Sequence, residues 1–229
     1  MNKKNITFTI FMILIIFIVF VSGYFLFQFN NTTQAPSVPN QNSTSTASTS
    51  TTSQLLPGMQ TSLLPWSSEI DNLKVRLDAI GLPALSQEGS ALHTHQHADI
   101  FIHGKQINLP KYIGVNDIDG FISPIHTHDD INIIHVESPT IQTFTLGQFF
   151  DIWGLFFNDK CIGGYCTDSN SNSNVNSDSK LQVFINGKEI TSDLRNIKLT
   201  AYEEIVITYG TAKEVPSSIP SSFNFPAGL

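Results

Sequence analysis

The stretch HTHQHADIFIHGKQI, residues 93–107, combines a strand, a turn and several of the chain's seven histidines. Its segment 98–102 (ADIFI) has the period-two pattern of a β-strand. Residues two apart on a strand face the same side, so His93, His95 and His97 are expected to form a row of imidazoles on one face. The stretch therefore predicts both an element of the fold and a candidate site.

The turn in this stretch occurs a second time in the chain. IFIHGKQI (100–107) and VFINGKEI (183–190) are nearly the same eight residues. In the second copy Asn186-Gly187 is a strong signal for a two-residue hairpin turn, whose first position needs a positive φ. His103 occupies the matching position in the first copy, and histidine tolerates that conformation. We therefore interpret His103 as a turn residue and not as a ligand.

Two helices are expected around these hairpins. Ser68 is expected to cap the first, which Gly81 ends. Thr145 is expected to cap the second, with Gln148 completing a capping box and Gly154 ending the helix. The second helix carries an aromatic stripe that we assign to the hydrophobic core.

Further strands are predicted at residues 131–137 and 204–209. The order helix, hairpin, strand, helix, hairpin, strand indicates an α+β fold with a mixed or antiparallel sheet and one or two covering helices. The part from Thr145 onward is similar to the second half of a β-grasp domain, an analogy that carries no function. A β-sandwich with one helix is the alternative.

The N-terminal residues predict where the protein resides. The run from Ile6 to Phe29 has no charged residue and is long enough to cross a bilayer, so residues 1–29 are expected to be a transmembrane anchor. A cleaved signal peptide is the alternative. Lys3 and Lys4 precede the run, which places the N-terminus in the cytoplasm. Residues 30–55, rich in Ser, Thr, Asn and Gln, are expected to be a disordered tether to an extracytoplasmic domain at 56–229.

Composition narrows the function classes. The net charge of −7 argues against a nucleic-acid partner. Cys161 and Cys166 are the only cysteines and enclose a short Gly-Gly loop, which outside the cytoplasm predicts a disulfide. Two thiolate metal ligands are the alternative interpretation.

The histidines carry the strongest chemical signal. All seven lie between His93 and His135, and a second set occurs in HTHDDINIIH (126–135). Imidazole is a common ligand of Zn(II) and Cu(II), so two strands could place both sets around one ion. Asp99, Asp129 and Asp130 could accept hydrogen bonds from the far nitrogens of ligating rings. The candidate ligands are His93, His95, His97, His126, His128 and His135.

Several strings resemble a family of small envelope-anchored proteins of archaea, including ammonia oxidisers, with some bacterial relatives. They are HTHQHADIFIHGK, SPIHTHDDINIIHVESP, FTLGQFFDIWG and CIGGYC. The resemblance covers about residues 90–210 and implies an anchored, extracytoplasmic protein, but it names no reaction. The copper-rich respiration of ammonia oxidisers favours copper over zinc.

Three hypotheses follow from the sequence. The leading one is a membrane-tethered module that captures, buffers or passes on copper or zinc. The second is an envelope interaction or structural module, with a protein partner in the envelope and histidines that serve turns, surfaces or hydrogen bonds. The third is a zinc hydrolase in which three imidazoles hold the ion and Glu137 or Asp129 acts as the base.

Overall fold

A computed structural model describes residues 55–128, 132–167 and 178–229 of the chain. The predicted anchor and all but the last residue of the predicted tether lie outside the described residues. Among the residues that are described, no helix has the length and apolar character needed to cross a bilayer.

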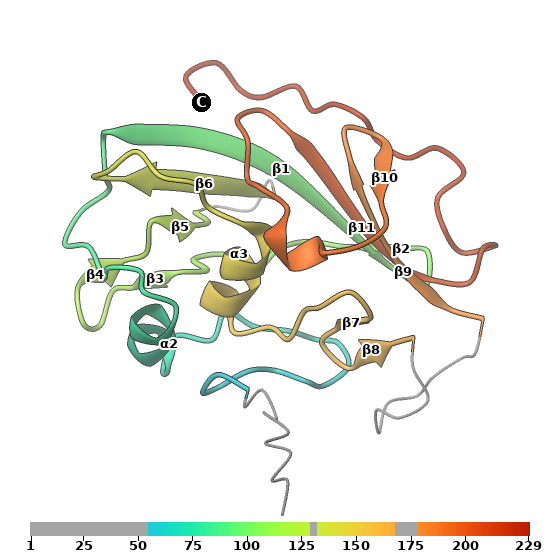
Figure 1. The fold of residues 1–229 in the computed structure, drawn as a ribbon, viewed down its shortest axis with the longest axis horizontal. Coiled ribbons are helices and arrows are strands. Elements are labelled where there is room, and N and C mark those ends of the chain that lie inside the picture. Colours follow the sequence, from blue (N-terminus) through green and yellow to red (C-terminus); the bar gives the residue numbers. More distant parts are fainter. Residues whose placement is uncertain (1–54, 129–131, 168–177) are drawn as a thin grey trace, which may run out of the picture. The chain divides into compact units, whose positions relative to one another are not determined.

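A mixed sheet of seven strands is the main element of the fold (Figure 1). Its strand order is β10-β9-β11-β1-β6-β5, and β2 pairs with the C-terminal end of β1. β1 is parallel to β11 and antiparallel to β6. The strands are β1 (Leu92–Ile102), β2 (Lys105–Ile107), β5 (Ile125–His126), β6 (Ile133–Ser138), β9 (Lys180–Ile185), β10 (Lys188–Ile190) and β11 (Glu204–Gly210).

Shorter elements surround this sheet. Two small two-stranded sheets pair β3 with β4 and β7 with β8. The remaining elements are α2 (Leu73–Ala79), β3 (Val115–Asn116), β4 (Phe121–Ile122), α3 (Leu146–Trp153), β7 (Cys161–Ile162), β8 (Tyr165–Cys166) and the 3-10 helix η1 (Leu194–Asn196). The expected α+β architecture, a mixed sheet with covering helices, is therefore confirmed.

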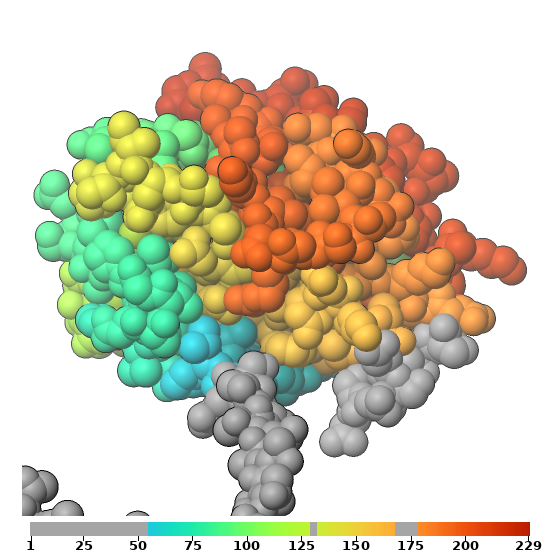
Figure 2. Space-filling model, viewed as in Figure 1, coloured from blue at the N-terminus to red at the C-terminus, as the bar shows by residue number. Residues whose placement is uncertain are grey.

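The two faces of β1 have different neighbours. Ala98 and Ile100 point into the hydrophobic core that α3 shares, and both are buried. His95 and His97 alternate with them and point to the opposite face. The C-terminal segment, residues 211–229, runs along that opposite side of the sheet, away from α3 (Figure 1). It also forms the upper rim of the surface in the space-filling view (Figure 2).

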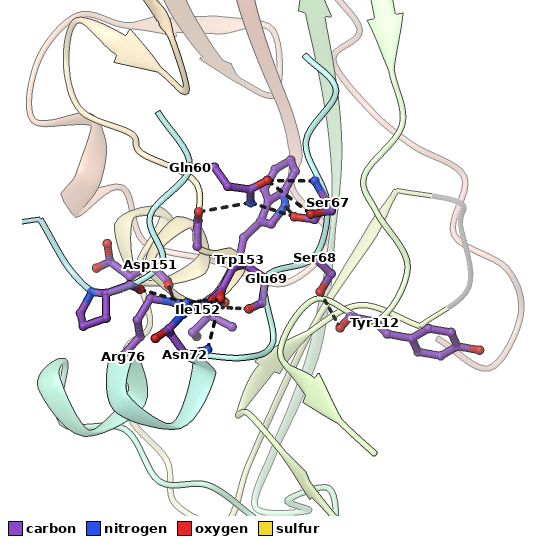
Figure 3. Close-up of polar contacts among 12 residues, drawn as sticks. Gln60, Ser67, Ser68, Glu69, Asn72, Arg76, Tyr112, Asp151, Ile152 and Trp153 are labelled. Atoms are coloured by element: carbon purple, nitrogen blue, oxygen red, sulfur yellow. Dashed lines mark hydrogen bonds and ion pairs between the residues drawn. The ribbon is translucent and has the colours of Figure 1, made fainter. Parts of the chain in front are cut away.

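One predicted helix is confirmed at both ends, and the start of the other is wrong. α3 is confirmed residue by residue: Thr145 and Gln148 form the capping box, and Gly154 ends the helix with a φ of 75°. The predicted cap of the first helix is wrong, because α2 begins only at Leu73. The Ser68 hydroxyl instead donates a hydrogen bond to the carbonyl of Tyr112 at 3.0 Å (Figure 3).

A buried arginine attaches α2 to the end of α3. The side chain of Arg76 has no exposed surface and pairs with the carboxylate of Glu69. Its guanidinium also donates hydrogen bonds to the carbonyls of Asp151, at 2.7 Å, and Ile152, at 3.0 Å (Figure 3). The last carbonyls of a helix have no partner within the helix, so Arg76 satisfies groups that burial would otherwise leave unpaired.

Both hairpin turns and the disulfide are confirmed. His103 and Asn186 have φ values of 50° and 51°, and each is followed by a glycine with positive φ. The two copies of the eight-residue pattern therefore form the same kind of turn. Cys161 and Cys166 are joined by a disulfide across the β7–β8 pair.

Candidate metal centre

Strand register brings three histidines into one row. His95 of β1 is the direct partner of His135 of β6, and His135 is in turn the partner of His126 of β5. Side chains of directly paired residues point to the same face of a sheet, with strands about 4.8 Å apart. The rings of His126 and His135 lie nearly parallel, with centroids 5.4 Å apart. Three segments of the chain thus contribute one line of imidazoles.

Each end of this row gains a second imidazole from its own H-x-H motif. The Nε2 atoms of His93 and His95 are 3.2 Å apart, and those of His126 and His128 are 3.1 Å apart. Two nitrogens bound to one tetrahedral ion at roughly 2.0–2.1 Å lie about 3.3 Å apart. Both pairs therefore already have the spacing of two ligands on a common ion.

Glu137 completes the group. The Glu137 carboxylate is buried, and its Oε1 atom lies 3.2 Å from His93 Nε2 and 3.3 Å from His135 Nδ1. Burial raises the pKa of this carboxyl, but a hydrogen bond from His135 and the neighbouring histidines outweigh it and lower the pKa to about 2. Glu137 is therefore a carboxylate at neutral pH and can act as an oxygen ligand.

From the sequence, Glu137 is expected only as a catalytic base. A signal for its place in the site exists, because Glu137 is two residues after His135 and so faces the same side of the strand. We call the set of His93, His95, His126, His128, His135 and Glu137 the histidine cluster. Its members form two groups that share Glu137. Within each group the potential ligand atoms all lie within 4.8 Å of one another.

The buried histidines of the cluster are neutral at physiological pH. Burial, together with the charge of His135, lowers the pKa of His95 to about 4, and burial with His128 does the same for His126. The Nδ1 atom of His126 is 3.0 Å from the carbonyl of Ser123, which can only accept a hydrogen bond. The proton of His126 therefore resides on Nδ1, which leaves the Nε2 lone pair directed toward His128.

The cluster is open to solvent at two points. The side chains of His93 and His128 are 54% and 38% exposed, whereas His126 is fully buried. A cleft of about 520 Å³ lies beside His128. Glu88 lines this cleft, and its Oε1 atom is 3.3 Å from His128 Nε2. An ion could therefore enter the cluster without rearrangement of the sheet.

His97 belongs to a different group. Its Nδ1 atom lies 2.8 Å from Glu204 Oε2, and its ring stacks on Phe223 with centroids 3.8 Å apart. Asp99 is 4.0 Å from His97 Nε2 and accepts a hydrogen bond from Gln106, so it is placed beside His97. His97, Asp99 and Glu204 form a third group of potential ligands. The structure thus brings five of the six candidate histidines together and places His97 with other partners.

His103, Asp129, Asp130 and Glu88 remain to be placed. His103 lies in its turn, with Nδ1 3.2 Å from Glu214, and is in none of the potential ligand groups among the described residues. Asp129 and Asp130 lie outside the described residues. Glu88 was not predicted, and no local sequence signal marks it, because its approach to His128 depends on the tertiary fold.

Buried imidazoles, an ionised carboxylate and preset nitrogen spacings can together coordinate a transition metal. We compared the chain with protein-family models, with curated proteins and with solved structures, and none of the three comparisons gave a match. The chemistry of the histidine cluster therefore rests on its own geometry.

Proposed function

We propose that the protein is a metal-binding module that holds copper or zinc in the histidine cluster. The observation that carries the proposal is the convergence of side chains from β1, β6 and the β5 region, with ligand atoms within 4.8 Å of one another in each group and two Nε2 pairs at ligand spacing. In the metal-free protein one ring of each pair can donate a hydrogen bond to the other, and a metal ion would replace that shared proton and bind both nitrogens.

The donor set favours Zn(II) and Cu(II). Imidazole nitrogen with one carboxylate suits both ions. Both cysteines are in the disulfide, so the chain offers no thiolate and the site differs from copper–thiolate centres. Copper is favoured over zinc only by the resemblance expected from the sequence, to envelope-anchored proteins of archaea including ammonia oxidisers.

We further propose that the module functions outside the cell membrane, anchored through residues 1–29. The uncharged run in those residues and the disulfide support this location. The exposure of His93 and His128 supports a role in capturing, buffering or passing on ions, because exposed ligands can exchange with a partner protein or a free chelator.

A zinc hydrolase is a second candidate, favoured by the cleft beside His128. Three imidazoles would hold the ion and a water molecule would take the fourth position. Glu88, at the same cleft, is better placed as a base than Glu137, which lies among the ligands. Turnover of ester or phosphoester probes that depends on both Zn(II) and Glu88 would favour this candidate over a transport or storage role.

The proposal is tested by metal titration of the full chain, purified in detergent and stripped with a chelator. We expect Zn(II) and Cu(II) to bind, and His126→Ala and His135→Ala each to weaken binding at least tenfold. The control is His103→Asn, which keeps the turn and should bind as the parent does. A parent protein that binds neither ion above the level of a histidine-free control would overturn the proposal and leave an interaction module as the better interpretation.

A further inference from the structure

We propose that the histidine cluster is a dinuclear centre in which the Glu137 carboxylate bridges two ions. One ion is held by His93 and His95, and the other by His126, His128 and His135. The inference rests on the proposed function, because it specifies how the same residues hold metal. It adds the stoichiometry, the bridging ligand and a difference between the two ions.

The donors outnumber what one ion accepts. The cluster has five imidazoles and one carboxylate, whereas Zn(II) in proteins almost always takes four ligands. The donors also fall into two sets: His93, His95 and Glu137 form one, and His126, His128, His135 and Glu137 form the other. Only the glutamate is common to both, so the imidazoles surround two positions.

Strand order explains why Glu137 is shared. β6 lies between β1 and β5, and it carries both Glu137 and His135. Glu137 is the direct partner of His93 across the β1–β6 pair, and its Oε1 atom contacts His93 on one side and His135 on the other. A carboxylate between two sets of imidazoles can bridge a pair of cations, which in two-metal sites are about 3.5–4 Å apart. Its negative charge would also reduce the repulsion between them.

The two positions differ in ligand number and exposure. The set on the β5 side has four donors, which is a closed shell of the kind found in structural zinc sites. The set on the β1 side has three donors, one of them the half-exposed His93, and so leaves a position for water or an incoming ligand. We therefore expect one tightly held ion and one exchangeable ion.

The first test is the stoichiometry of Zn(II) binding to the metal-stripped full chain, measured by calorimetry and native mass spectrometry. The parent should bind two ions per chain in two steps. His93→Ala should bind one ion with the affinity of the tighter step. Glu137→Gln removes a ligand from both positions, so it should weaken both steps, the second at least tenfold. His103→Asn is the matched control and should bind two ions. His93 is half exposed, so its replacement should leave the thermal unfolding of the metal-free protein unchanged.

The second test uses Cu(II) and electron paramagnetic resonance. Two Cu(II) ions bridged by one carboxylate at about 3.5–4 Å are magnetically coupled. The parent loaded with two equivalents should therefore show a coupled spectrum, and His93→Ala should show the spectrum of an isolated ion. One ion per chain in the parent, lost in step with every ligand variant, would overturn the dinuclear centre and leave the proposed function intact. Failure of the parent to bind any ion would instead refute the proposed function itself.

Discussion

His126 shows at the scale of one residue how burial prepares an imidazole for coordination. Its side chain is fully buried, its pKa is lowered to about 4, and the Ser123 carbonyl holds its proton on Nδ1. At neutral pH no proton has to leave Nε2 before a metal binds. His95 has the same lowered pKa for the same first cause, burial.

These two lowered pKa values predict how the metal-free protein responds to acid. The unfolded chain binds protons at its histidines near pH 6.5, whereas folded His95 and His126 resist protonation until about pH 4. The contribution of these two histidines to the free energy of unfolding is therefore fully present above pH 6.5. It is lost as the pH drops from 6.5 toward 4. For buried His126 the loss between pH 6.5 and 5 should be about 1.5 kcal/mol.

Urea unfolding in the presence of a chelator at several pH values measures this effect. His126→Gln removes the titrating group and should flatten the profile over the same interval. A profile of the variant that is as steep as that of the parent would show that other groups cause the acid sensitivity.

At the scale of elements, what the sequence could predict depended on how local the determining contacts are. α3 is correct to the residue because Thr145, Gln148 and Gly154 act within the helix itself. α2 begins later than predicted, and the expected cap Ser68 instead donates a hydrogen bond to Tyr112, which is 44 positions away in the chain. A local pattern cannot reveal that contact.

The same distinction applies to the site. The period-two pattern predicted which face of β1 carries the histidines. It did not predict the register of β1 on β6 and β11. That register gives His95 a histidine partner and gives His97 the partner Glu204, 107 positions away. Two histidines on one strand thus enter different groups for a reason that only the tertiary structure supplies.

Arg76 offers a prediction for the packing of α2 on α3. Arg76→Ala would leave the partly buried carboxylate of Glu69 and the carbonyls at the end of α3 without their buried partner. Loss of one member of such a buried pair typically costs about 3–5 kcal/mol, and we expect a decrease of that size in the free energy of unfolding.

Lys74→Ala is the control on the same helix. Lys74 pairs with Asp78 on the exposed surface, so its loss should cost less than about 1 kcal/mol. Equal destabilisation by the two substitutions, measured by denaturant unfolding, would contradict the role assigned to Arg76.

At the scale of the whole molecule, the sheet separates packing from chemistry. One face, with α3 against it, belongs to the hydrophobic core, and the other carries the histidine cluster and the C-terminal segment. Phe223 of that segment stacks on His97, which is buried together with Asp99 and Glu204.

This arrangement predicts that Phe223 acts on stability and not on the histidine cluster. Phe223→Ala should lower the free energy of unfolding by about 1–3 kcal/mol, because the ring loses its buried contact with His97. Zn(II) affinity at the histidine cluster should stay within twofold of the parent value. A large loss of Zn(II) affinity in this variant would show that His97 and the cluster act as one site.

The proposed function requires that the imidazoles of β1, β6 and the β5 region hold metal. Anomalous diffraction from crystals of the zinc-loaded protein, recorded on both sides of the zinc absorption edge, would locate the bound ions. We expect a strong anomalous peak within ligand distance of His126, His128 and His135, and a second peak between His93, His95 and Glu137. Zinc peaks only at other surface positions, with the imidazoles of the cluster unligated, would contradict the proposed function.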